Sequence, residues 1–136
     1  MLSRNLRMDN FVTDTQALVK FMMGKKVIND RSFKAYQSAD KGLAIIIIPA
    51  VVLMEILYLF EKNRIDVGLL HTKELIKSQN YQFEPLSFDI LMTASSINDI
   101  PELHDRLIAA TAKYLGLPLI TNDPVIKKSE HVEILE

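Results

Sequence analysis

Apolar residues along this chain form short continuous runs and longer stretches in which they recur every three or four positions. The clearest run is LAIIII at 43–48, whose unbroken apolar character is typical of a strand covered on both faces. The clearest helical spacing is at 102–115, and this stretch ends at Gly116. Strand-like and helix-like segments follow one another, which predicts a parallel sheet packed between helices.

Residues that favour helix ends mark where these elements begin. Asp14 and Ser87 are preferred N-cap residues, and Pro49 suits the first turn of a helix. Strands are predicted at 10–13, 43–48, 81–86, 117–121 and 132–135. Helices are predicted at 30–41, 50–63, 66–78, 87–96 and 102–115, with one more directly after Asp14 and a short one after Pro124. This order predicts a three-layer α/β/α sandwich around a mostly parallel central sheet.

Length and composition agree with a single domain that spans residues 1–136. Hydrophobic residues make up 49% of the 136 residues and charged residues 24%, which is the balance of a globular protein. We expect residues 1–7 to be a disordered extension, because Met8 offers an alternative start. The absence of cysteine excludes disulfides and thiolate metal sites.

Hydropathy and net charge limit where the protein acts and what it binds. The longest apolar stretch is interrupted by Pro49 and Glu55, so we expect no membrane span. The first ten residues lack the apolar segment of a secretory signal, and we therefore expect a cytoplasmic protein. The net charge is −1, so a nucleic-acid partner would have to be met by a local basic patch.

One charged residue lies inside the most apolar helical stretch. Glu55 follows the segment VVLM and precedes ILYLF. Burying an unpaired carboxylate is costly or forces the group to take up a proton. Either Glu55 belongs to a polar stripe that it shares with Lys62, or it lies in a cleft where it binds a positively charged group.

Three further acids are predicted at one edge of the sheet. Asp14 follows the first strand, Asp123 follows the fourth, and Asp105 lies in the first turn of the helix that leads to the fourth strand. Ligands of open parallel sheets bind outside the carboxyl ends of the strands, and the topology brings Glu55 to the same edge. Each of the three also has a structural interpretation: Asp14 as a helix cap, Asp105 as a partner of the helix dipole, and Asp123 as a turn residue.

Four sequence strings carry this pattern together. They are FVTDTQAL at 11–18, PAVVLMEIL at 49–57, HDRLIAATAKYLGLPLITNDPVI at 104–126 and the closing VEIL. The chain resembles the PIN-domain ribonucleases over nearly its whole length, and in particular the small VapC-type toxins of toxin–antitoxin pairs. The resemblance implies a metal-dependent endoribonuclease that uses Mg²⁺ or Mn²⁺ and leaves 5′-phosphate ends.

The resemblance also implies which residues form the site. It assigns metal binding and catalysis to Asp14, Glu55, Asp105 and Asp123, with Thr15 and Thr121 as supporting hydroxyls. Carboxylate oxygens suit Mg²⁺ and Mn²⁺, which lower the pKa of bound water and neutralise charge on a phosphate. Without metal, four neighbouring carboxylates repel one another, and their pKa values should rise.

Two neighbours of Asp105 are weaker candidates. His104 adjoins it, but successive residues of a helix point about 100° apart, so we do not expect both to bind one ion. Glu102 shares a helix face with Asp105, and it either holds a metal-bound water or stabilises the helix dipole.

Substrate and partner contacts are predicted less sharply. Basic residues that either hold RNA phosphates or form a solvated surface are Lys20, Lys25, Lys26, Arg31 and Arg106. The resemblance implies a cognate antitoxin that blocks the cleft and a homodimer. Apolar side chains that either form such a surface or pack in the core are Met22, Met23, Phe33 and Tyr36.

Two other functions fit parts of the pattern. A catalytically inactive PIN-like module that binds RNA or protein would keep the same fold. A phospho-receiver domain is also a parallel α/β protein of similar length, but it would need an acidic neighbour of Asp14 and a lysine after the last strand. The chain has neither, which favours the nuclease.

Overall fold

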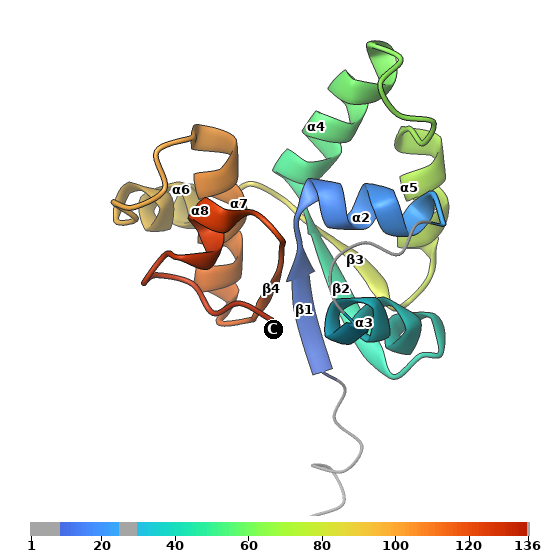
Figure 1. The fold of residues 1–136 in the computed structure, drawn as a ribbon, viewed down its shortest axis with the longest axis horizontal. Helices are drawn as coiled ribbons and strands as arrows, with labels where there is room; N and C mark the ends of the chain where they lie inside the picture. The colour runs from blue at the N-terminus through green and yellow to red at the C-terminus, as the bar shows by residue number, and fades with distance from the viewer. Residues whose placement is uncertain (1–8, 25–29, 136) are drawn as a thin grey trace, which may run out of the picture.

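A parallel four-stranded sheet forms the centre of the protein, in a computed structural model that describes residues 9–24 and 30–135 (Figure 1). The strands are β1 (Asp9–Thr13), β2 (Ala44–Pro49), β3 (Tyr81–Glu84) and β4 (Leu119–Ile120). Their spatial order is β3-β2-β1-β4, and every neighbouring pair is parallel. The predicted parallel sheet is confirmed. Residues 1–7, which we expected to be an extension, lie outside the described residues.

Helices cover the sheet on both faces. Those in the described part of the chain are α2 (Thr15–Met22), α3 (Asp30–Asp40), α4 (Ala50–Glu61), α5 (Leu69–Lys77), α6 (Phe88–Ser95), α7 (Leu103–Leu115) and α8 (Pro124–Lys127). From β1 to β2 to β3 the chain moves in one direction across the sheet, and it then returns past β1 to β4. Because such crossovers are right-handed, α2 to α5 lie on one face and α6 and α7 on the other. The predicted three-layer sandwich is confirmed.

Several predicted boundaries differ from the structure, and three elements show a local cause. The helix predicted at 66–78 begins only at Leu69, because the backbone N–H of Gly68 donates to His71 Nδ1 at 2.9 Å and caps the helix there. The third strand ends at Glu84, since Pro85 has no N–H for the ladder. The fourth strand starts after Pro118 for the same reason and has only two residues.

The final strand predicted at 132–135 is reduced to a single bridge. Ile134 pairs with Leu119 in parallel, and the backbone of Leu119 accepts from Leu135 N at 2.9 Å and donates to the Glu133 carbonyl at 2.8 Å. Because β4 has only two residues, residues 132–135 cannot form a longer series of hydrogen bonds with it. The prediction of a full fifth strand was therefore wrong.

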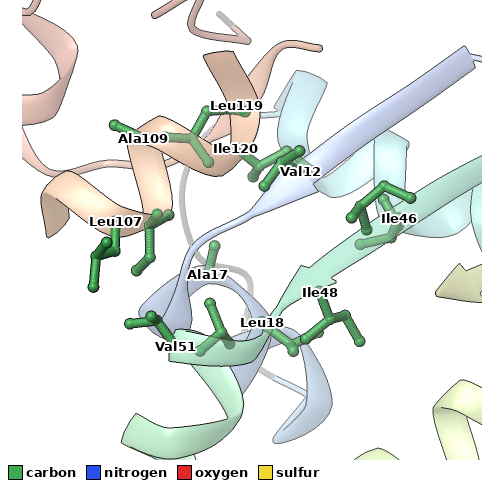
Figure 2. Close-up of a cluster of buried hydrophobic side chains, with 14 of the residues drawn as sticks. Val12, Ala17, Leu18, Ile46, Ile48, Val51, Leu107, Ala109, Leu119 and Ile120 are labelled. Carbon is green, nitrogen blue, oxygen red and sulfur yellow. The ribbon is translucent and has the colours of Figure 1, made fainter. Parts of the chain in front are cut away.

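The hydrophobic core lies where the strands meet helices from both faces (Figure 2). Ile46 and Ile48 of the run LAIIII are buried on one face of β2 and Ile47 is buried on the other, as expected for a strand covered on both sides. Figure 2 shows Ile46 and Ile48 with Val12, Leu119 and Ile120 from the neighbouring strands and with Ala17, Leu18, Val51, Leu107 and Ala109 from the helices. This packing holds the carboxyl ends of β1, β2 and β4 in fixed positions.

The aromatic residues proposed as a partner surface are part of this packing instead. Tyr36 is fully buried, stacks on Phe21 with ring centres 4.5 Å apart, and bonds through its hydroxyl to Thr13 Oγ1. Phe33 makes an edge contact with Phe21, and Met22 packs against the core. Of the two interpretations of Tyr36, core packing is therefore correct, because α3 turns this side chain toward β1.

None of the helices in the described part of the chain combines the length and the apolar character needed to cross a bilayer.

Candidate active site

Two of the predicted acids, Asp14 and Asp123, lie at the edge of the sheet formed by the carboxyl ends of its strands. Strand β1 lies between β2 and β4, and the crossovers that lead to these two neighbours run in opposite directions across the sheet. Such a reversal opens the crevice in which open α/β sheets bind ligands. Asp14 follows β1 directly, and its backbone N–H donates to the carbonyl of Ile120, the last residue of β4, at 3.1 Å. Asp123 lies three residues beyond Ile120 at the same edge.

A pocket of about 830 Å³ opens at this crevice. All four predicted acids line it: Asp14, Glu55, Asp105 and Asp123. They come from the ends of β1 and β4, from α4 and from the first turn of α7. The structure thus brings together carboxylates that are up to 109 positions apart in the sequence, from 14 to 123.

Asp14 is the most buried of these acids and has two roles in the structure. Its side chain is 7% exposed, and Oδ1 accepts the backbone N–H of Ala17 at 2.9 Å, which caps α2. Burial raises the pKa of Asp14 above its ordinary value, and the hydrogen bond from Thr121 opposes this rise. The cap interpretation of Asp14 is correct, and the same residue also lines the pocket.

Glu55 points from the apolar helix α4 into the pocket. Its Oε1 accepts a hydrogen bond from the hydroxyl of Thr15, and its Oε2 lies 3.2 Å from His104 Nδ1. The polar groups of α2 and α7 therefore hold Glu55 from two sides. The pairing with His104 was not expected from sequence, because the pattern along α7 does not show which residue of α4 it meets.

Asp105 lies beside the other acids in the first turn of α7. Burial is the main cause that raises the pKa of Asp105 to about 6, followed by the negative charges of Asp123, Glu102, Glu55 and Asp14. Glu102 caps this helix, since its Oε1 accepts the backbone N–H of Asp105 at 2.8 Å. Of the two interpretations of Glu102, the structure shows a role at the helix end.

Asp123 begins the short helix α8. Its Oδ1 accepts the backbone N–H groups of Val125 and Ile126 at 2.9 and 3.1 Å. Its own N–H donates to Thr121 Oγ1 at 3.1 Å, and the Thr121 side chain also bonds to Asp14. Both predicted hydroxyl groups, Thr15 and Thr121, thus contact one of the acids.

Of the basic residues predicted to contact RNA, some line the pocket and others do not. Lys20, on α2, lines the pocket. Arg106 does not: its guanidinium donates to the carbonyls of Ile100 and Pro101 at 3.1 and 3.3 Å. Arg31 is exposed on α3 and is not among the pocket residues. Lys25 and Lys26 lie outside the described residues.

The chemistry of the pocket suits a hard divalent cation. Among the described residues, no lysine or arginine forms an ion pair with any of the four acids. Carboxylate oxygens supported by hydroxyls are the ligands that Mg²⁺ and Mn²⁺ prefer. In the same part of the chain, no three acidic or imidazole groups are already close enough to hold one ion together. The donor set fits the ion, and binding would require these side chains to move closer to one another.

Fold and pocket together define a parallel α/β protein with an acidic ligand site at the reversal point of its sheet. The chain belongs to the PIN domain family, whose family model matches residues 11–131. No curated protein matches the chain closely enough to count as a relative.

Several solved structures share this fold. A structure of VapBC2 from Rickettsia felis, bound to a DNA fragment from their promoter, aligns with a TM-score of 0.66 and 17% identity, over 92% of this chain and 96% of that one. FitAcB from Neisseria gonorrhoeae aligns with a TM-score of 0.63 and 15% identity, over 93% and 96%. VapC20 from Mycobacterium tuberculosis, a toxin that cleaves the sarcin-ricin loop, aligns with a TM-score of 0.64 and 14% identity, over 93% and 99%.

Proposed function

We propose that this protein is an endoribonuclease that depends on Mg²⁺ or Mn²⁺ and hydrolyses RNA phosphodiester bonds. The observation that carries the proposal is the gathering of Asp14, Glu55, Asp105 and Asp123 in one pocket at the reversal point of the sheet. Membership of the PIN domain family supports it as well. None of the described lysines and arginines forms an ion pair with these four acids. Their negative charge is therefore available to bind a metal ion, whereas it would be unfavourable in a site for an apolar ligand.

The four acids would hold the metal, and their neighbours keep them in place. When bound, the cation supplies an activated water and neutralises charge on the phosphate. Thr15 and His104 hold Glu55 toward the pocket, and the α2 cap holds Asp14. Lys20 lies in the same pocket, where it can contact a phosphate next to the one that is cleaved.

We also propose that the protein is the toxin of a toxin–antitoxin pair that acts in the cytoplasm. Support comes from the shared fold with VapBC2, with FitAcB and with a toxin–antitoxin complex from Klebsiella pneumoniae. An antitoxin protein would cover the pocket, and two copies of the chain would form a homodimer. Exposed apolar side chains suited to a homodimer contact are Phe88, Leu91 and Met92 on α6.

The first prediction concerns cleavage itself. Purified protein incubated with bulk cellular RNA should cleave it in Mg²⁺ or Mn²⁺ but not in excess EDTA. Asp14→Asn keeps an oxygen for the cap of α2 and removes a charged ligand, so it should lose cleavage while staying folded. Fragment ends can be mapped by sequencing, and 5′-phosphate ends are expected.

Thermal melts provide a second measurement that does not depend on turnover. Mn²⁺ should raise the melting temperature of the wild type by mass action, and that of Asp14→Asn less. Cleavage that persists in EDTA or in Asp14→Asn would exclude the proposed mechanism. If the wild type binds RNA and never cleaves it, the protein is an inactive binding module.

A further inference from the structure

The pocket has a second wall that the acids do not explain. On α4, the two residues Met54 and Tyr58 line the same pocket as Glu55 and are 46% and 52% exposed. Tyr58 lies one helical turn from both Met54 and Glu55, so the three side chains border one opening. Neither side chain offers the carboxylate oxygens that a hard cation prefers.

The size of the pocket also exceeds what a metal ion requires. Its volume of about 830 Å³ lies within the range of roughly 300–1,000 Å³ that is typical of sites for organic ligands. A divalent ion with its waters would fill only the acidic end. Met54 and Tyr58 line part of the pocket, where a flat organic group could be held.

A positive charge lies over the exposed ring, from a residue that does not itself line the pocket. Lys62, one turn beyond Tyr58 on α4, places its Nζ 5.7 Å from the centre of the Tyr58 ring. Lys20 lines the pocket from α2. An aromatic face with lysines beside it is the combination with which proteins bind single-stranded nucleic acid, because bases stack on the ring and lysines meet the phosphates.

We propose that Tyr58 is the stacking platform for an unpaired nucleobase of the RNA substrate, next to the phosphate that the acids hold, with Lys62 and Lys20 at the flanking phosphates. This inference rests on the proposed function. Stacking on Tyr58 requires the RNA to be unpaired at the cleavage site, because a base inside a duplex cannot reach the ring. Lysines beside the ring favour a nucleic-acid occupant over an apolar protein segment.

The test measures stacking directly. A short single-stranded RNA that carries 2-aminopurine is titrated into Asp14→Asn protein with Mg²⁺ present, and the loss of fluorescence on stacking reports binding. Adding Tyr58→Ala should weaken binding roughly 5- to 150-fold, the range that corresponds to the loss of one stacked base. Tyr58→Phe keeps the ring and should bind nearly as well as the parent.

Two further variants separate stacking from other effects. Tyr114→Ala removes a tyrosine of similar exposure on α7, outside the pocket, and should leave binding unchanged. Lys62→Gln should weaken binding and reduce its dependence on salt concentration, since one phosphate contact is lost. All variants should keep the parent melting temperature to within a few degrees, because Tyr58 is half exposed.

The outcomes distinguish this inference from the proposed function. Equal RNA binding by Tyr58→Ala and its parent overturns the inference and leaves the nuclease proposal standing. If that variant instead fails to capture a co-expressed antitoxin, the surface binds protein. A third outcome is that the loss of fluorescence depends on Tyr58 while the wild-type protein cleaves no RNA with any metal. This result supports the inference and overturns the nuclease proposal. Absence of any fluorescence loss overturns the inference whether or not RNA is cleaved.

Discussion

Single residues in this protein combine structural and chemical roles that the sequence presents as alternatives. Asp14 caps α2 and also lines the pocket, because the chain turns from strand to helix exactly at the carboxyl edge of the sheet. Asp105 shows the electrostatic consequence of this arrangement, since burial and the neighbouring acids raise its pKa to about 6. Burial is the main cause of the raised pKa at both Asp14 and Asp105, whereas the sequence predicted a rise through repulsion between the acids.

The raised pKa of Asp105 predicts a stability effect that depends on pH. Between the ordinary pKa of 3.8 and the folded-state pKa of about 6, the native protein binds more protons than the unfolded chain. The free energy of unfolding without metal therefore falls as pH rises through this window. The Asp105→Asn variant has no carboxylate here, so its free energy of unfolding should not fall in this window. It should be more stable than wild type by on the order of 1 kcal/mol at about pH 7.5, with little difference at about pH 4.5.

Asp89→Asn is the matched control for this experiment. Asp89 is a first-turn acid of α6, exposed and outside the pocket, so its neutralisation should slightly destabilise the protein by removing a favourable interaction with the helix dipole. Denaturant unfolding at both pH values gives the comparison. An Asp105→Asn protein that is less stable than wild type at both would mean that Asp105 acts only at the helix end.

At the scale of elements, most boundaries could be predicted because they depend on local chemistry. The cap at Ser87 and the glycine after α7 lie where the sequence indicates. Pro49, expected in the first turn of a helix, instead ends β2 and occupies the N-cap position of α4. The last strand could not be predicted, since its length depends on how much edge β4 offers. Periodicity reports what one segment prefers, whereas pairing requires a partner of matching length.

The end of α7 provides a prediction at this scale. Gly116 has φ 69° and ψ 34°, a left-handed conformation, and a Cβ placed there would meet no atom within 4 Å. Gly116→Ala should therefore cost about 1 kcal/mol of stability through backbone strain alone. Gly116→Asn should cost less, because asparagine adopts this conformation more readily. Denaturant midpoints measure both, and equal losses would show that the backbone conformation is not the cause.

The molecule as a whole is proposed to act as a toxin, and this can be tested in cells. Expression in a host that lacks the antitoxin should arrest growth, because RNA cleavage would continue unchecked. Asp105→Asn should relieve the arrest, since it removes one acid from the pocket. Growth curves after induction measure the effect, and blots confirm equal protein levels. Harmless expression of a protein that is active in vitro would exclude the toxin role and leave the nuclease.

The sequence by itself determined the order of the helices and of the first four strands, the parallel sheet and the four acids at its edge. These depend on periodicity, caps and connection order, which are properties of neighbouring residues. The tertiary structure alone decided that His104 meets Glu55, that Tyr36 is buried, that Arg106 turns away and that Tyr58 borders the pocket. Each of these depends on how α3, α4 and α7 pack on their neighbours, because packing selects which side of a helix faces the site.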